Sequence, residues 1–175
     1  MQEVCIKLDD NFVSIKKILQ KISLEEKAEI CFSYISDFRS AKILRDCVNE
    51  ICNLLGVDST PKNRLILVID ELNNNAMEYG SLFGETNNMY FCFDKNIDSL
   101  LIKVEVEDTG NGYETKKAKD MEIIREENKK RNFSYHKSIR GRGLGLITEK
   151  IVDRLYFKDS ASGGLIVGIE MKIKK

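Results

Sequence analysis

The sequence predicts an α+β fold, an α/β sandwich in which a mostly antiparallel mixed sheet is covered on one face by helices. Segments with helical apolar spacing come first and segments with alternating apolar residues follow, so the order differs from that of a doubly wound fold. The chain also has neither an internal repeat nor a G-x-x-x-x-G-K-[ST] phosphate loop. Its 175 residues are enough for one domain with a real core.

The first half of the chain predicts helices on either side of one strand. Residues 1–28 combine a short apolar alternation with a helix, and residues 29–36 form the strand. Residues 38–55 form an amphipathic helix that Gly56 ends. The next helix has Ser59 and Thr60 as candidate caps and Pro61 at its first position, and it stops at Gly80. Its core stripe comprises Leu65, Ile69, Leu72 and Ala76.

The second half predicts strands, with helical segments between them. Residues 88–94 and 99–107 form a hairpin, and Ile102, Val104 and Val106 lie on one face of its second strand. Residues 113–140 are polar, with a helix at about 118–130. A glycine-rich turn then leads into a helix at 143–154, and a strand at 164–173 closes the chain. The apolar stripe of that last helix comprises Leu144, Ile147, Ile151 and Leu155.

Composition excludes several classes of function. A formal net charge of zero gives no global basic field for nucleic acid or an anionic membrane. No apolar run is long enough to span a bilayer, and no secretory signal is present, so we expect a cytoplasmic protein. The five cysteines form no C-x-x-C pair, which favours reduced thiols. The single histidine, His136, excludes a three-histidine zinc site.

Three short blocks carry residues suited to chemistry, and the first lies on the second long helix. Glu71 and Asn75 are four residues apart, so they share a helix face away from the apolar stripe. A carboxylate and an amide oxygen placed this way suit a hydrated Mg²⁺, and the carboxylate could orient a nucleophile. The alternative is a solvated polar face, which three adjacent asparagines weaken because they are poor helix formers.

The second block follows the strand at 99–107. Asp108 is in phase with Ile102, Val104 and Val106, so its carboxylate points to the covered side of the sheet. An unpaired buried charge is unfavourable, and an exocyclic amine such as that of adenine would supply a donor. Gly110 and Gly112 allow a flat ring to approach the backbone. The alternative is a simple turn that ends the strand.

The third block has alternating glycines at the predicted start of a helix: Gly141, Gly143 and Gly145, with Arg142, Leu144 and Leu146 between them. Exposed amides and the helix dipole bind anions such as phosphates at such positions. No strand immediately precedes these glycines, which argues against a dinucleotide-binding motif. A flexible hinge is the alternative.

In this order, the blocks resemble the N, G1 and G2 boxes of the GHKL superfamily of ATPases, which has the Bergerat ATP-binding fold. The fit covers about residues 29–173. Within that superfamily the chain is most similar to the bacterial anti-sigma factor serine/threonine kinases, since the stretch from Ser162 to Val167 resembles the start of their last strand. The resemblance implies an ATPase domain at 29–175 and an N-terminal extension at 1–28, a candidate docking or dimer segment.

The resemblance also implies a role for each site residue. Asn75 would hold Mg²⁺, and Glu71 would act as the general base. Asp108 would accept a hydrogen bond from the adenine amine, in a pocket lined by Gly110 and Gly112. Residues 113–140 would form a lid over the nucleotide. The expected phosphate contacts are Arg140, Gly141, Arg142, Gly143, Leu144 and Gly145.

The function so implied is that of an ATP- and Mg²⁺-dependent protein serine/threonine kinase. It would phosphorylate an anti-sigma antagonist protein and hold a sigma factor, as a homodimer without direct nucleic acid or membrane contact. The alternative is a nucleotide-binding interaction module with little turnover, which would not need the carboxylate of Glu71.

Overall fold

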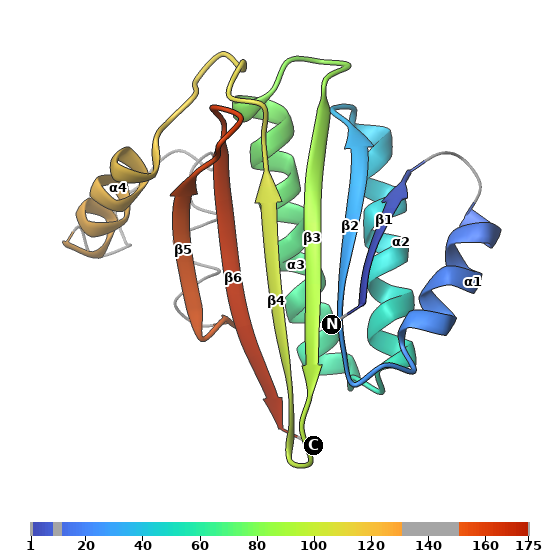
Figure 1. Ribbon diagram of the computed structural model, residues 1–175. Helices are drawn as coiled ribbons and strands as arrows, with labels where there is room; N and C mark the ends of the chain where they lie inside the picture. Colours follow the sequence, from blue (N-terminus) through green and yellow to red (C-terminus); the bar gives the residue numbers. More distant parts are fainter. Residues whose placement is uncertain (1, 9–11, 131–150, 175) are drawn as a thin grey trace.

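The computed structural model describes residues 2–8, 12–130 and 151–174. These residues form a six-stranded sheet with the order β1-β2-β3-β4-β6-β5. The first two strands pair in parallel and every other neighbouring pair is antiparallel, which confirms the predicted mixed sheet (Figure 1). The strands are β1 (Gln2–Lys7), β2 (Lys27–Ile35), β3 (Thr86–Lys95), β4 (Ser99–Glu107), β5 (Arg154–Asp159) and β6 (Leu165–Lys174).

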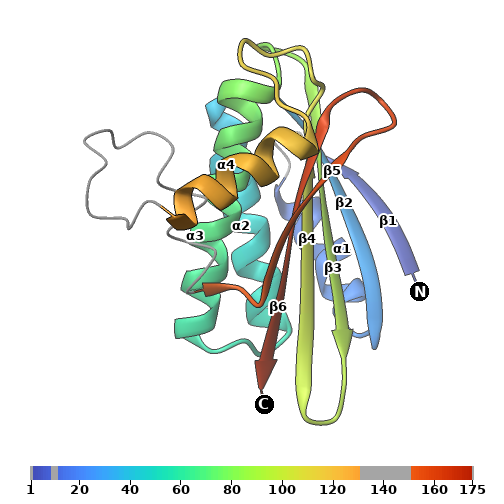
Figure 2. The same cartoon turned by 90° about the vertical axis from the view of Figure 1, so that its left-hand side faces the viewer.

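Helices cover one face of this sheet. Helices α2 (Phe38–Leu54) and α3 (Ser59–Asn75) lie on the same side of it in Figure 2, and α1 (Phe12–Ile22) packs beside α2. Helix α4 (Ala118–Lys130) contacts β5 at the edge of the sheet. The other face carries the polar half of each alternating strand. The fold is therefore the predicted sandwich of one helical layer and one sheet.

The core lies between the helices and the covered face of the sheet. In β2, β3, β4 and β6 every second side chain is buried there, as period-two alternation requires. Phe32, Phe91 and Ile102 are fully buried, and they face Leu65 and Ile69 of the predicted α3 stripe within one cluster. The stripe predicted for α3 is thus its core face.

The N-terminal segment 1–28 is part of the same sheet and core. Strand β1 pairs with β2, and Ile15, Leu19 and Ile22 of α1 are buried in the common cluster. Packing into the sheet gives this segment a structural role. Its predicted role as a docking or dimer segment stays a prediction.

The start of α3 differs from the prediction. Asp58 is the residue before the first helical one, so the helix begins at Ser59, and Ser59 and Thr60 are not its caps. The amide of Lys62 donates to the carbonyl oxygen of Asp58 at 3.0 Å, which closes the first turn one residue early. Pro61 lies in that first turn, where a missing amide proton leaves no hydrogen bond unmade.

The far end of α3 widens into a π-helical turn. Residues Ala76–Gly80 form a π-helical turn directly after Asn75, so the helical segment does end at Gly80 as predicted. Such turns are rare and occur frequently at functional sites. The turn brings the backbone of Tyr79 and Gly80 against the loop that follows β4.

The prediction for the C-terminal region is partly wrong. The predicted helix at 143–154 falls mostly on residues 131–150, which lie outside the described part of the chain. However, Arg154 and Leu155 belong to strand β5, in which Leu155 pairs with Ile169 of β6. The side chain of Leu155 is buried in either kind of element, so its apolar spacing could not distinguish them. Pairing with β6 decides that it is a strand.

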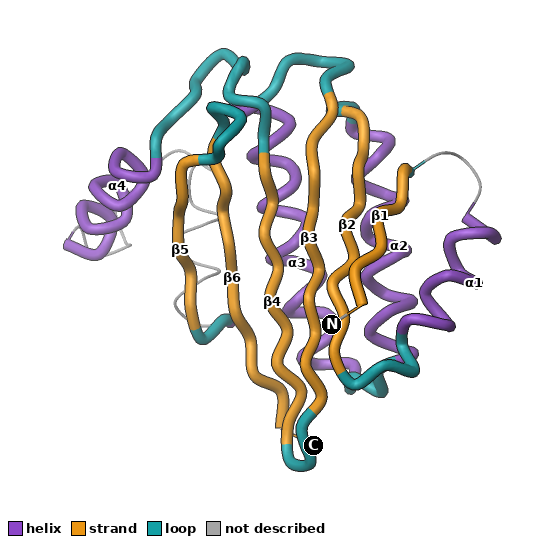
Figure 3. Tube along the Cα trace, in the orientation of Figure 1, coloured by secondary structure: helices purple, strands orange, loops and turns teal. Residues whose placement is uncertain are grey.

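The antiparallel topology gathers several loops at one end of the sheet (Figure 3). The turn after β2, the loop between Gly80 and β3, the loop after β4 and the turn between β5 and β6 all lie there. Gly80, which ends the helical segment that carries the first block, and Asp108 of the second block therefore meet at that end, although 28 positions separate them in the sequence.

A buried hydrogen bond explains one of the three adjacent asparagines in α3. The side chain of Asn73 is 1% exposed; its Oδ1 accepts from Tyr34 Oη at 2.7 Å, and its Nδ2 donates to the Ile69 carbonyl at 2.8 Å. Burial raises the pKa of Tyr34, so its hydroxyl stays a donor. Asn73 thus joins α3 to β2 through a polar contact inside the core.

We predict that Asn73→Ala lowers the free energy of unfolding by about 1–3 kcal/mol, because it leaves the buried Tyr34 hydroxyl without this acceptor. Urea denaturation measures the change. Asn74→Ala is the matched control: it removes a partly exposed asparagine from the same helix, gains the same helix propensity, and should stay within about 0.5 kcal/mol. Equal effects of the two substitutions would contradict a specific role for Asn73.

Candidate functional site

The carboxylate of Asp108 lies at the end of β4, on the covered side of the sheet as its phase predicts. Asp108 is 9% exposed. Its Oδ1 accepts hydrogen bonds from the backbone amides of Gly110, at 3.0 Å, and Leu165, at 2.9 Å. Its Oδ2 accepts no hydrogen bond from any residue that the structure describes. One oxygen therefore holds the local backbone, and the other is left to accept from a ligand.

Three glycines close around this carboxylate. A Cβ atom added at Gly80 would lie 2.1 Å from Asp108 Oδ2, and one at Gly164 would lie 2.0 Å from the Asp108 carbonyl oxygen. Gly110 has a φ of +72°, and its added Cβ would lie 2.7 Å from the Gly163 carbonyl oxygen. Side chains at these positions would force the backbone segments apart. The glycines let the end of the π turn, the loop after β4 and the start of β6 meet at Asp108.

Burial shapes the electrostatics of Asp108. Loss of water raises its pKa above the ordinary value, against the opposing effect of the amides of Leu165 and Gly110. The charge of Glu107 adds to the rise, and that of Lys117 opposes it. The charged form is therefore costly without a ligand, and a donor that reaches Oδ2 would stabilise it.

Glu71 and Asn75 share one face of α3, as their spacing predicts. Asn75 Nδ2 donates to Glu71 Oε1 at 3.3 Å, and both side chains are partly exposed. This donation leaves the amide oxygen of Asn75 available as an acceptor or metal ligand. Gly80, which contacts Asp108, follows on the same helical segment. The helical segment that carries Glu71 and Asn75 thus ends against Asp108 of the second block, and the joint role of the two blocks stays a prediction.

The loop after Asp108 is attached to the π turn through backbone contacts. The amide of Gly112 donates to the Gly80 carbonyl at 3.1 Å, and that of Glu114 donates to the Tyr79 carbonyl at 3.4 Å. A Cβ atom added at Gly112 would lie 2.0 Å from the Tyr79 carbonyl oxygen. Glycine is thus required at 110 and 112 by the chain's own backbone, and their place in an adenine pocket stays a prediction.

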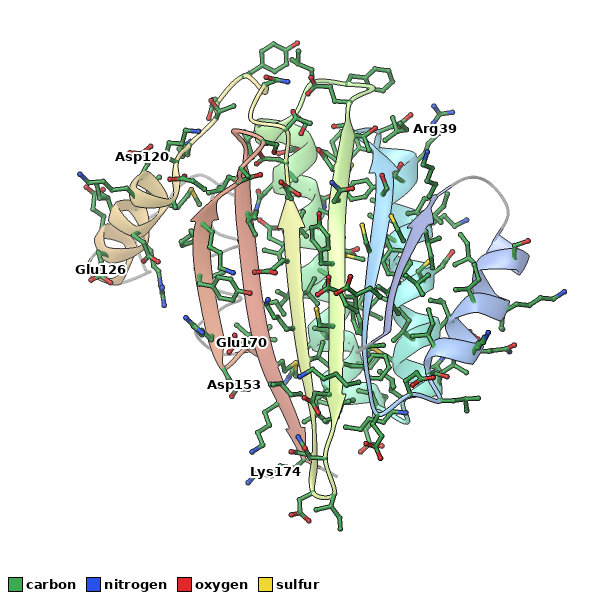
Figure 4. The ribbon with its side chains drawn as sticks, in the orientation of Figure 1. Arg39, Asp120, Glu126, Asp153, Glu170 and Lys174 are labelled. Carbon is green, nitrogen blue, oxygen red and sulfur yellow. The ribbon has the colours of Figure 1, made fainter. Side chains whose placement is uncertain are left out.

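The described part of the predicted lid is anchored at the edge of the sheet. A residue of another element caps the N-terminus of its helix α4: the carboxylate of Asp159, in β5, accepts a hydrogen bond from the Ala118 amide at 2.8 Å. Asp120, labelled in Figure 4, accepts from the Lys117 amide at 3.0 Å. Lys117 Nζ also donates to the Gly163 carbonyl at 2.7 Å. These contacts connect the lid to the same turn that packs on Gly110.

The predicted phosphate contacts lie outside the described residues. They are Arg140, Gly141, Arg142, Gly143, Leu144 and Gly145, with Leu146 beside them. Their assignment to the nucleotide stays a prediction.

Several residues at the site were not identified from the sequence as parts of it. In the sequence, Gly80 is recognisable only as a helix stop, and nothing connects the amide of Leu165 with Asp108. Only the family resemblance points to the pair Gly163–Gly164. Ser81 and Glu85 form hydrogen bonds with Thr109, which belongs to the second block, and no spacing rule connects them with it. Contacts between distant backbone segments leave little trace in one sequence.

A mostly antiparallel sheet with helices on one face, and a buried aspartate packed against the end of a helix, agree with an ATPase domain of the histidine kinase type. A family model described as the histidine kinase-like ATPase domain matches residues 36–170, more than half of the chain. The chain therefore belongs to this family, which implies that it binds ATP. It matches none of the curated proteins compared with it. Within the described segments, every helix is too short or too polar to cross a bilayer.

We predict that Asp108→Asn stabilises the nucleotide-free protein at neutral pH. The folded pKa of Asp108 lies above its unfolded value, so the stability it contributes is complete below the unfolded pKa and is lost as pH rises through the folded pKa. Removing the charge should therefore raise the free energy of unfolding at pH 7, and the gain should vanish near pH ~3.5, where unfolded aspartate is largely protonated. Urea denaturation at both pH values tests this; an equal gain at both would contradict it.

Proposed function

We propose that this protein is a serine/threonine kinase of the anti-sigma factor type. It uses ATP to phosphorylate a serine of a small anti-sigma antagonist protein, and it holds a sigma factor when the antagonist does not compete. The observation that carries the proposal is the partly exposed carboxylate of Glu71, on the helical segment whose end packs against Asp108. A protein that only binds nucleotide does not need this carboxylate.

The chain's own residues supply positioning and proton transfer. Asp108 Oδ2 accepts a hydrogen bond from the adenine amine and so orients the nucleotide. Glu71 accepts the proton of the serine hydroxyl. The serine oxygen forms a bond to the γ-phosphorus while the bond from that phosphorus to the β–γ bridging oxygen breaks, and ADP leaves. In-line transfer of this kind depends mainly on positioning and charge stabilisation.

Asn75 would hold Mg²⁺ through its amide oxygen, since its nitrogen donates to Glu71. When bound, the ion supplies charge neutralisation for the phosphates. Among the described residues, no group of three or more His, Cys, Asp or Glu side chains could hold a metal. Water and phosphate oxygens would complete the coordination, as Mg²⁺ usually requires.

The alternative is an interaction module that binds nucleotide with little turnover. The hydrogen bond from Asn75 favours this module, because the bond occupies one oxygen of Glu71, the proposed base. Incubation with radiolabelled ATP and candidate antagonist proteins from the same genome separates the two functions. Label on a serine supports the kinase. ATP binding without label on any candidate contradicts it and leaves the module.

We predict that Glu71→Gln binds ATP within about twofold of wild type but transfers phosphate about 10²–10⁴-fold more slowly, as expected when a general base is lost. Calorimetry measures the first quantity and the labelling assay the second. Glu78→Gln is the matched control, since Glu78 is an exposed carboxylate on the following turn. Wild-type transfer by the Glu71 variant would show that another group accepts the proton.

We also predict that Asp108→Ala weakens ATP binding by about 1.5–3 kcal/mol, the usual range for a hydrogen bond to a charged group. Asp98→Ala, in the exposed turn between β3 and β4, is the control and should bind ATP as wild type does. Unchanged affinity of the Asp108 variant by calorimetry would remove Asp108 from the nucleotide pocket.

A further inference from the structure

We propose that Glu85 is a positioning residue for nucleotide binding: its carboxylate holds the loop that follows Asp108 in the conformation that accepts adenine. Glu85 lies immediately before β3 and belongs to none of the three predicted blocks. The inference rests on the nucleotide-binding part of the proposed function and not on phosphoryl transfer.

Both oxygens of Glu85 bind the loop after Asp108. Oε2 accepts from the hydroxyl of Thr109, and Oε1 accepts from Asn111 Nδ2 at 2.8 Å. Thr109 and Asn111 are the two neighbours of Gly110, whose amide donates to Asp108 Oδ1. A single carboxylate therefore fixes the residues on both sides of the amide that orients Asp108.

Ser81 also forms hydrogen bonds with this loop. The amide of Thr109 donates to Ser81 Oγ at 3.0 Å, and Ser81 Oγ donates to the buried Asn87 Oδ1 at 2.6 Å. Ser81 Oγ also lies 3.1 Å from the hydroxyl of Thr109, so this contact holds Thr109 but does not reach the side chain of Asn111. Glu85 thus shares Thr109 with Ser81 and alone restrains the Asn111 side of the loop.

The backbone of Glu85 is itself well anchored. The amide of Ser36 donates to the Glu85 carbonyl at 2.7 Å, and the amide of Gly84 donates to the Ser36 carbonyl at 3.2 Å. The amide of Leu82 also donates to Glu85 Oε2 at 2.9 Å, which closes the 81–85 loop on itself. The carboxylate is therefore presented from a fixed position, and it can restrain a neighbouring loop.

The charged form of Glu85 is the form that makes these contacts. Donation from Thr109, the Leu82 amide and Asn111, in that order of effect, lowers the pKa of Glu85, and burial opposes this only weakly. The carboxylate is thus ionised at neutral pH and accepts from all three donors. Charge-assisted hydrogen bonds are stronger than neutral ones, so this contact suits the restraint of a turn.

A purely structural role would have a different signature. Glu85 is only partly buried and lies outside the apolar core, and Asn111 is exposed. Without Glu85, the donors of Thr109 and Asn111 can turn to water, so no polar group is left buried and unpaired. We therefore expect a loss of nucleotide affinity and only a small fall in the thermal midpoint of unfolding, from the hydrogen bonds that Glu85 itself makes.

The test is the affinity of the full chain for ATP and for ADP, measured by calorimetry on three variants. Glu85→Ala should weaken both nucleotides equally, by about threefold to tenfold, because the loop faces the base and not the γ-phosphate. Glu85→Gln, which keeps one acceptor oxygen, should recover part of the loss. Glu25→Ala, an exposed glutamate before β2, is the control and should match wild type.

A second variant shows whether Glu85 acts through the loop. Thr109→Val should also weaken both nucleotides, and the double variant should lose less than the product of the two single effects, since both remove one contact. Three results would overturn the proposal: unchanged affinity of Glu85→Ala, fully multiplicative effects, or a fall in the thermal midpoint that accounts for the lost binding. A failure to label any antagonist protein contradicts the kinase but leaves this binding test intact.

Discussion

The structure of the site depends on how one buried carboxylate is satisfied. Asp108 Oδ1 accepts two backbone amides, one from the loop after β4 and one from the start of β6. This contact holds neighbouring segments together while it partly offsets the loss of water around the charge. Because Oδ2 stays without a partner among the described residues, the same group that organises the site is also available to a ligand. Burial of this carboxylate raises the pKa of Asp108, because the charged form loses water and gains only the two amides.

Close packing of backbone around Asp108 explains why glycine occurs on several segments that meet there. Gly80 ends the π turn, Gly110 takes a left-handed conformation beside Gly163, and Gly164 lies against the Asp108 carbonyl. Each contributes by the absence of a side chain, which lets polar backbone groups approach within hydrogen-bonding distance. This end of the domain is therefore built mainly from backbone, with Asp108 and Glu85 as the carboxylates that bind the loop after β4.

Most elements could be predicted because their apolar residues repeat with the period of a helix or a strand. The alternation in β4 predicts Asp108 on the covered face, and Asp108 is buried there. The errors arose where local patterns are ambiguous. The cap of α3 lies at Asp58 and not at its polar neighbours Ser59 or Thr60, and Leu155 fits a helix or a strand equally well. A hydrogen-bonded partner, β6 in the second case, decides between such alternatives.

By itself, the sequence determined the class of fold, the core faces of the main elements and the family to which the chain belongs, because periodicity and short motifs are local properties. It also placed Glu71 and Asn75 on one face of a helix. Only the tertiary structure decided which amides Asp108 binds, why Asn73 is an asparagine, and which residues hold the loop after β4. Those answers depend on atoms brought together from distant positions, and hydrogen-bond geometry between such segments is set by the packed sheet and not by any spacing along the chain.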